Sequence, residues 1–304
     1  MTVDPTEITP TPEQTAGLVP TPAVDPKNAR ALRRKEFIRA LLRSKTFIVG
    51  AVLVIFWVLD AIFWRAIVPH DPQAPSVNTF QAPSSAHWFG TDNLGRDVFS
   101  RVLAGASDVL VVAPLATFLG VSGGIVVGLV SGYFRGWPDD VISRVTDAVL
   151  SFPLIIIAVL VLASLGRDTR NVILVIAFIF IPIVGRTVRS AVLVEREREY
   201  VAAARLRGER GSYIMFAEIL PNITGPILVE STIRFGYAIF TAATLSFLGL
   251  GLQPPSPDWG LQIAEGRVYI QIAWWMVLWP AAALATLVVG VNLAADGLRQ
   301  VVEE

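Results

Sequence analysis

Few residues of this 304-residue chain have types and spacings that could support chemistry. Asp92 and Asp97 lie close together in one polar segment, and paired carboxylates can act as a general acid and a general base. The sequence shows no sign of the cleft that such a pair needs, so we discount an enzymatic role. Asp97 is better explained as the N-cap of a helix whose apolar residues, from Val98 to Leu103, form an interfacial face.

Histidine is the other candidate for chemistry, because the chain contains no cysteine. Its only two histidines, His70 and His87, are far apart in one polar segment. A transition-metal site needs three or four nitrogen, oxygen or sulfur ligands within reach, and the sequence shows no such cluster around either residue. The sequence therefore predicts no metal site. We expect both histidines to face solvent or to be second-sphere residues.

The three lysines exclude chemistry on ATP within this chain. They are Lys27, Lys35 and Lys45, and none follows a glycine-rich turn. A P-loop needs a lysine at that position to reach the β- and γ-phosphates. We therefore expect the chain not to be an enzyme, to have no catalytic residues and to hold no cofactor of its own.

The composition indicates a membrane protein. The chain is 53% hydrophobic and 16% charged, whereas a soluble domain carries about 25% charged residues. Each of six apolar stretches has roughly the 20 residues that a helix needs to cross ~30 Å of hydrocarbon. The predicted fold is therefore all-α and polytopic, with transmembrane helices at 46–68, 108–134, 141–166, 171–192, 227–250 and 272–293.

Prolines and glycines modify these predicted helices. Pro114, Pro153, Pro182 and Pro280 fall within four of the stretches, where they can kink a helix or leave it merely curved. The glycines at 120, 123, 124 and 128 include pairs spaced by four, which permit close contact with another helix of this chain or of a partner.

Charge sets the expected topology. Residues 1–29 are rich in Pro, Thr and Asp and are predicted to be a disordered cytoplasmic tail, which leaves 30–304 as the transmembrane domain. Basic residues crowd the stretch before the first span and recur within 193–226. By the positive-inside rule both termini and 193–226 are cytoplasmic, and 69–107 is periplasmic, in a bacterial inner membrane.

Among the charged residues inside predicted spans, Glu230, Arg234 and Asp60 are candidates for a polar pathway. Glu230 and Arg234 are four positions apart, in the order that favours an ion pair along one helix. Intramembrane charges often line a polar pathway, but these two lie near the cytoplasmic end, where pairing alone would explain them. Both interpretations remain open for this pair. Asp60, deeper in the first span, has no evident partner in the sequence.

A polar hairpin separates two of the most apolar stretches. Residues 199–222 read EYVAAARLRGERGSYIMFAEILPN. The pattern predicts a helix, a turn in which Gly208 and Gly211 supply positive φ angles, a short apolar helix, and an end at Pro221. Aromatic and apolar side chains beside arginines are typical of a protein contact surface, although a helix resting on anionic lipid has the same composition.

The hairpin resembles the cytoplasmic loop motif of ABC importer permeases, which is Glu-Ala-Ala, three residues, Gly, nine residues, Ile-x-Leu-Pro. The matching residues are Ala203, Ala204, Gly208, Leu220 and Pro221, whereas Ala202 replaces the motif's Glu and Glu218 its Ile. Three further stretches resemble peptide and nickel permeases: HWFGTDNLGRDVFSRVLAGA at 87–106, SFLGLGLQPPSPDWG at 246–260 and AWWMVLWPAAALATLVVGVNLAADGLR at 273–299. From about residue 30 onward the pattern resembles the second, C-type permease of dipeptide and oligopeptide importers.

This resemblance implies a type I ABC importer permease fold and a set of partners. These are a homologous permease, two cytoplasmic ATPases that bind ATP and Mg, and an extracytoplasmic substrate-binding protein. It also implies that the hairpin couples to an ATPase, through Ala203, Ala204, Arg205, Gly208, Gly211, Tyr213, Leu220 and Pro221. In the periplasmic segment it implies a gate or a binding-protein contact at Asp92, Gly95, Arg96 and Asp97.

Other functions remain as alternatives. Within the same family the cargo could be nickel or another chelate rather than a peptide. An ion-coupled secondary transporter would show internal repeats and acidic groups at mid-membrane, and the sequence shows neither clearly. An intramembrane enzyme would need a polar constellation within the spans, and none is evident.

Overall fold

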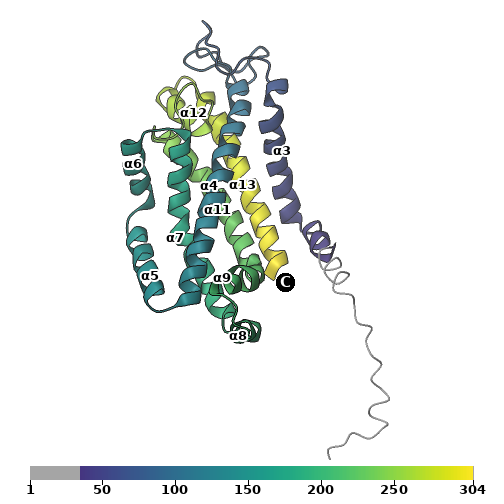
Figure 1. Cartoon of the computed structure of the whole chain (residues 1–304). Coiled ribbons are helices and arrows are strands. Elements are labelled where there is room, and N and C mark those ends of the chain that lie inside the picture. Colours follow the sequence, from purple (N-terminus) through teal and green to yellow (C-terminus); the bar gives the residue numbers. More distant parts are fainter. Residues whose placement is uncertain (1–34, 304) are drawn as a thin grey trace, which may run out of the picture.

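The structure, a computed structural model, describes residues 35–303. The predicted disordered tail, 1–29, lies outside the described residues. Within the described part, regular structure is helical apart from one isolated bridge between Thr91 and Asp97. The long helices run side by side as a bundle with two distinct ends (Figure 1).

Four single helices are long and apolar enough to cross a membrane: α3 (Lys45–Ile67), α4 (Val98–Phe134), α7 (Thr169–Glu195) and α13 (Trp275–Glu303). Two bent pairs pass the same test, so the described part has up to six spans. One pair is α5 (Trp137–Leu150) with α6 (Leu154–Leu165), bent by 84°. The other is the segment Gly211–Asn222 with α11 (Thr224–Phe247), bent by 73°. The prediction of an all-α polytopic fold is confirmed.

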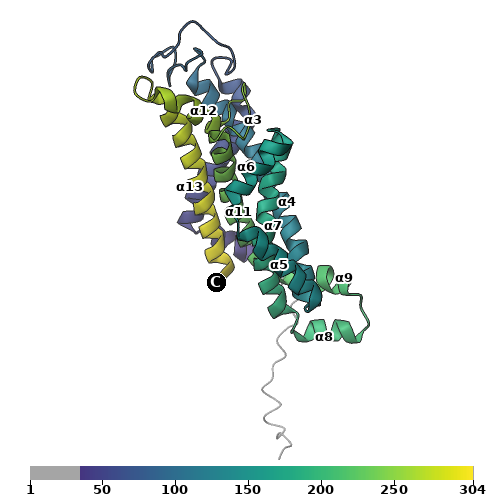
Figure 2. The same ribbon diagram turned by 90° about the vertical axis from the view of Figure 1, so that its left-hand side faces the viewer.

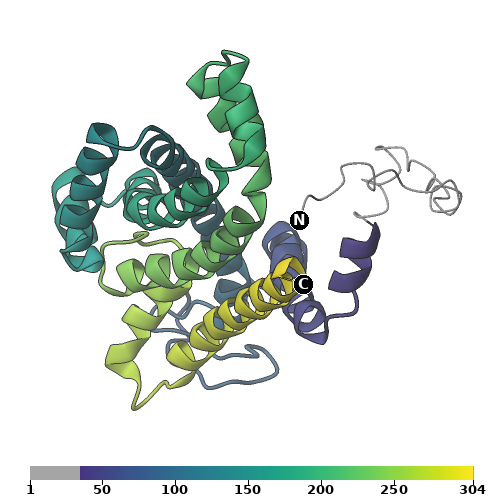
Figure 3. The ribbon, with the colours of Figure 1, turned by 90° about the horizontal axis from the view of Figure 1, so that it is seen from below.

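The two ends of the bundle carry different structures. Residues 68–97 form a long loop at one end, next to the short helix α12 (Trp259–Gly266) (Figure 1). The opposite end carries the C-terminus and the hairpin, which projects sideways from the bundle (Figure 2). Seen along the bundle, the hairpin extends well beyond the helices, and α3 lies beside α13 at the margin (Figure 3).

The helix α4 begins ten residues before the predicted span. It starts at Val98 because the side chain of Asp97 accepts a hydrogen bond from Ser100 N, as predicted for a cap. The prediction of a separate interfacial face on these residues is wrong, since Val98, Val102 and Leu103 are buried in the core. The helix is continuous from this cap to residue 134, so its polar first turns and its apolar span belong to one helix.

The predicted span 141–166 is not one straight helix. It divides between α5 and α6 at residues 151–153, and Pro153 is the N-cap of α6. Proline has no N–H to continue the hydrogen-bond ladder and it disfavours helical geometry in the residue before it. Pro114, Pro182 and Pro280 lie inside continuous helices, so only one of the four prolines ends a helix.

Close packing of α4 against α7 holds the bundle together. A Cβ atom added at Gly124 would lie 2.5 Å from Val184 Cβ, and one at Gly128 would lie 2.5 Å from Val188 Cβ. Gly120 and Gly132 make equivalent close approaches to the same helix. These glycines are spaced by four, so one face of α4 lets the two helix backbones approach closely. The predicted glycine contact therefore forms within this chain.

Replacing Gly124 with leucine should loosen this contact. The added side chain would enter space occupied by Val184, and overpacking of this kind costs about 1–3 kcal/mol. We expect a lower thermal unfolding temperature for the purified variant in detergent. Val126→Leu, at a half-exposed position on the same helix, is the control and should leave that temperature unchanged. Equal shifts for both variants would contradict the packing argument.

Candidate functional site

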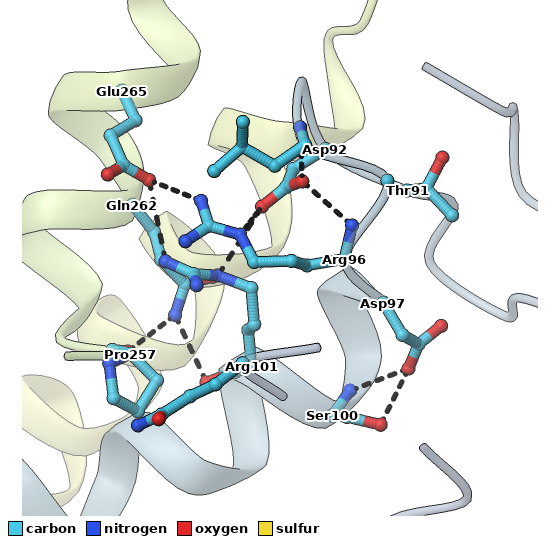
Figure 4. Close-up of polar contacts among 12 residues, drawn as sticks. Thr91, Asp92, Arg96, Asp97, Ser100, Arg101, Pro257, Gln262 and Glu265 are labelled. Carbon is cyan, nitrogen blue, oxygen red and sulfur yellow. Dashed lines mark hydrogen bonds and ion pairs between the residues drawn. The ribbon is translucent and has the colours of Figure 1, made fainter. Parts of the chain in front are cut away.

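A cluster of four charged side chains occupies the end of the bundle that carries the long loop (Figure 4). Asp92 and Arg96 come from the loop, Arg101 from the first turn of α4, and Glu265 from α12. Arg96 Nε donates to Asp92 Oδ2 at 2.6 Å, and its Nη2 donates to Glu265 Oε2 at 3.0 Å. Arg101 Nη2 donates to the same Glu265 oxygen at 3.4 Å. We call these four residues the outer charge cluster, after the periplasmic position predicted for residues 69–107.

The outer charge cluster is deeply buried. The side chains of Asp92, Arg96 and Arg101 are at most 5% exposed, and only Glu265, at 25%, reaches solvent. Asp92 also accepts hydrogen bonds from Leu94 N and Arg96 N through its other oxygen. Two guanidiniums share two carboxylates, so formal charge is balanced where water has little access. The cluster ties the loop to α4 and α12.

Hydrogen bonds to main-chain carbonyls fix α12 against α4 beside this cluster. Trp259 Nε1 donates to Val102 O at 2.7 Å, and Gln262 Nε2 donates to Arg101 O at 3.1 Å. Asp258 caps α12 by accepting from Leu261 N, and burial raises the pKa of this carboxyl to about 6. The outer end is therefore a packed unit rather than a flexible loop.

All four residues that were predicted for a gate or binding-protein contact are buried here. Asp92, Arg96 and Asp97 are 3–4% exposed, and Gly95 packs against Ser76 with a φ of +71°. They shape the loop and do not form its outer surface. A contact role for this end thus remains a prediction, which exposed neighbours such as Val77 and Trp88 would carry.

The sequence analysis missed two members of the outer charge cluster. Arg101 was included in the predicted interfacial helix, and Glu265 is 164 positions further along the chain. No local pattern links these two residues. Arg101 lies in the stretch at 87–106 that resembles peptide permeases, whereas Glu265 falls between the stretches at 246–260 and 273–299.

His70 is exposed to solvent as expected, but the expectation that no possible ligands cluster around the two histidines is wrong. The loop folds back so that the rings of His70 and His87 lie 4.8 Å apart, beside the carboxylate of Asp97. Three groups able to bind a metal therefore meet where the sequence showed no cluster. The reason is that the loop closes over the N-terminus of α4, which brings residues from distant positions together.

The second candidate site is the hairpin, residues 199–222. It contains α8 (Glu199–Leu206), a turn, and a helical segment made of α9 (Gly211–Tyr213), the π-helical η1 (Ile214–Ile219) and α10 (Leu220–Asn222). Gly208 lies in the turn with a φ of +76°, as predicted. Across the turn, Arg207 Nη2 donates to Glu218 Oε1 at 3.4 Å.

Gly211 does not supply a positive φ, so that part of the turn prediction is wrong. It is the first residue of α9, and a Cβ atom added there would lie 3.1 Å from the ring of Tyr133. Here glycine serves close packing against the end of α4. Pro221 lies within α10, and the chain bends into α11 at Ile223, so the short helix does not end at Pro221.

One face of the hairpin is buried within the chain and the other is open. Ala204 and the apolar residues Ile214 and Met215 are buried, and Leu220 is partly buried. Six of the exposed residues form what we call the hairpin surface: Ala203, Arg205, Leu206, Tyr213, Phe216 and Pro221. Leu206 is 91% exposed, which is unusual for leucine beside charged residues, and the sequence analysis did not single it out.

The hairpin is anchored to the ends of α4 and α7. Arg196 Nη1 donates to Tyr133 O at 2.7 Å and to Gly132 O at 3.2 Å. The guanidinium of Arg205 lies over the ring of Tyr133, 5.4 Å from its centroid. Tyr200 donates to Glu195 Oε1, and burial together with this hydrogen bond raises the pKa of Tyr200 to about 12. Movement of the hairpin would therefore act on both helices.

The predicted ion pair in the fifth span is present. Arg234 Nε lies 2.7 Å from Glu230 Oε1, and the guanidinium also lies over the ring of Tyr237. A role of this pair in lining a pathway stays a prediction. Asp60 in α3 is buried, and in the described part of the chain neither of its oxygens accepts a hydrogen bond.

Comparison with known proteins identifies the family of this chain. Residues 124–304 match the family described as inner membrane components of binding-protein-dependent transport systems. The chain belongs to this family. Residues 33–83 of the permease match the N-terminal transmembrane domain of oligopeptide transport permease C, which supports the predicted C type.

Relatives and a solved structure agree with this assignment. The permease is 40% identical over 270 residues to the dipeptide transport system permease protein of Alkalihalophilus pseudofirmus, with 88% of this chain and 89% of the relative covered. It is 40% identical over 290 residues to a glutathione transport system permease protein of Escherichia coli, with 95% of each covered. An inward-facing structure of the MetNI methionine ABC transporter shares its fold, with a TM-score of 0.55 at 20% identity over 66% of this chain and 96% of the other.

Asp92→Asn should destabilise the outer end of the permease. It removes a buried negative charge that faces two guanidiniums, and breaking a buried pair in this way costs about 3–5 kcal/mol. We expect a lower unfolding temperature and faster proteolysis within 69–97. Glu265→Gln is the comparison, because its carboxylate is partly solvated and its loss should cost less. A larger effect of Glu265→Gln would contradict this description of the cluster.

Proposed function

We propose that the chain forms half of the transmembrane pathway of an ATP-driven importer of dipeptides or oligopeptides. A second, similar permease would supply the other half. Two cytoplasmic ATPases would bind ATP and Mg and drive the cycle, and an extracytoplasmic binding protein would deliver the substrate. The proposed cargo class follows from the names of relatives that are 40% identical over most of the chain.

The observation that carries this proposal is the hairpin surface. It projects from one end of the bundle (Figure 2). Its Leu206, Tyr213 and Phe216 are exposed, and several arginines lie near them in the sequence. Aromatic residues and arginine are enriched at protein interfaces. A lipid surface would favour the same composition, but α8 is backed by its own chain through Val201 and Ala204 and turns its charged residues outward. An ATPase cleft is the partner that the family implies.

Coupling would follow from the anchoring of the hairpin. A partner that closes around ATP would displace the hairpin, and α11 would move with it because only Ile223 separates the two. The bonds of Arg196 to the end of α4 would pass the displacement to that helix. The pathway would then open alternately to the two sides of the membrane. In this arrangement the hairpin end is cytoplasmic and the outer charge cluster periplasmic, which agrees with the positive-inside prediction.

Gly208→Val should uncouple ATP hydrolysis from uptake in the reconstituted complex. A β-branched residue is strained at a φ of +76°, so the turn would have to rearrange. No neighbouring atom lies within 4 Å of an added Cβ, so a clash is not the cause. Gly208→Asn is the matched control, because asparagine tolerates this conformation, and it should keep coupled transport. Transport would be measured as peptide uptake per ATP hydrolysed. Coupled transport by both variants would contradict the proposed role of the turn.

Leu206→Ser should weaken binding of the ATPase to the permease. The substitution removes an apolar side chain from the hairpin surface without disturbing the core, since Leu206 is 91% exposed. We expect at least about a fivefold loss of co-purified ATPase, equivalent to about 1 kcal/mol. Val77→Ser, equally exposed at the other end of the bundle, should leave co-purification unchanged. Equal retention of ATPase by the two variants would place the contact elsewhere.

A further inference from the structure

Three side chains converge at the outer end of the bundle, beside the outer charge cluster. His70 follows the end of α3, His87 lies in the middle of the loop, and Asp97 caps α4. The imidazole rings are 4.8 Å apart and tilted by 35°. Neither histidine is used by the proposed transport function, and the chain contains no others.

The distances among these groups are close to those of a metal site. His87 Nδ1 lies 2.9 Å from Asp97 Oδ1, and His70 Nδ1 lies 3.9 Å from Asp97 Oδ2. One ligand atom of each residue can be chosen so that all three lie within 4.8 Å of one another. Tetrahedral zinc with bonds of about 2.0–2.1 Å holds its ligand atoms roughly 3.4 Å apart. The site would therefore need to contract by little more than about 1 Å.

Two of the three ligands are held in place. Asp97 Oδ2 accepts from Ser100 N at 2.8 Å and from Ser100 Oγ at 2.7 Å, so the carboxylate is fixed by the start of α4. The main chain of His87 is fixed by a turn, since His87 O accepts from Ser84 N and Gly90 N. His70, whose side chain is 44% exposed, would make the largest movement, and His87 Nδ1 and Asp97 Oδ1, now 2.9 Å apart, would separate by about 0.5 Å. A fixed carboxylate with an exposed imidazole can make an adjustment of this size.

The cap of α4 does not require both histidines. Ser100 and His87 already satisfy the two oxygens of Asp97. His70 adds a second imidazole at a longer distance, next to a cavity of about 310 Å³. Asp71 and Asn78 also line this cavity, so its wall is polar. It has ample room for a metal-bound water, whose share of liquid volume is about 30 Å³.

We propose that His70, His87 and Asp97 bind a divalent transition-metal cation of the zinc class. Two imidazole nitrogens and one carboxylate oxygen would hold the ion, and a water molecule from the cavity would fill the fourth position. The bound ion would link the end of α3 to the start of α4 and fix the loop between them. This proposal does not depend on the transported substrate.

The chain itself makes a clean test possible. It has no cysteine and no other histidine, so any imidazole ligation must come from these two residues. The full-length permease, purified alone in detergent with a histidine-free tag, would be titrated with Zn²⁺ alone by calorimetry. We expect one Zn²⁺ per chain. His70→Asn and His87→Asn should each lower the affinity at least about tenfold, since second-sphere changes alone cost that much.

Two further measurements separate ligation from folding. Electron paramagnetic resonance of the Cu²⁺-loaded protein should show hyperfine coupling to two imidazole nitrogens, and to one in His70→Asn. Asn78→Ala perturbs the same cavity wall without removing a ligand, and it should bind Zn²⁺ as the unaltered protein does. No stoichiometric Zn²⁺ binding, no nitrogen coupling, or an equal loss of affinity in Asn78→Ala would each overturn the proposal.

Discussion

The contact between α4 and α7 is the constraint on which the rest of the structure depends. Between helices in lipid there is little hydrophobic driving force, so association relies on close packing. The glycine face of α4 supplies it, with Gly124 and Gly128 against Val184 and Val188. The same two helices hold the hairpin through Arg196 at one end. At the other end α4 supplies Asp97 and Arg101 to the loop and to α12. Both candidate sites are thus fixed to one helix pair.

Charged residues are arranged differently at the two ends of the bundle. At the outer end, opposite charges are buried together, and Asp92 and Glu265 balance Arg96 and Arg101. Such an arrangement favours one conformation of the loop, because each charge would be costly without its partner. At the hairpin end the charges are mostly exposed and the apolar residues are divided between core and surface. The first arrangement holds a structure together, whereas the second leaves a surface free for a partner.

Local sequence patterns predicted the features that local physics decides. The apolar stretches, the cap at Asp97, the ion pair of Glu230 with Arg234 and the positive φ of Gly208 all depend on neighbouring residues, and all are present. Features that depend on tertiary contact were missed or misread. Nothing near Arg101 indicates Glu265, and nothing near His70 indicates His87.

Two local expectations also failed, for identifiable reasons. The role of Gly211 was predicted wrongly because glycine can be needed for two different reasons. It can allow a positive φ, or it can leave space for a neighbouring ring, and the sequence does not distinguish the two. The break at Pro153 was expected as a kink at most, since proline inside an apolar stretch can kink, curve or end a helix. In the structure the helix ends before Pro153, which becomes the N-cap of α6.

The length of α4 has a consequence for the membrane around the protein. Its 37 residues span about 55 Å at 1.5 Å per residue, whereas the hydrocarbon is ~30 Å thick. An average tilt of about 20° shortens its projection by only a few ångströms, so roughly 20 Å of this helix must stand outside the hydrocarbon. Its first turns carry Ser100 and Arg101, whose side chains are buried within the protein, so this end of the helix is covered by the loop and α12. The length of the lipid acyl chains therefore determines how far the hydrocarbon extends toward this end of α4. We expect hydrophobic mismatch to affect first the region where the loop is anchored to α4.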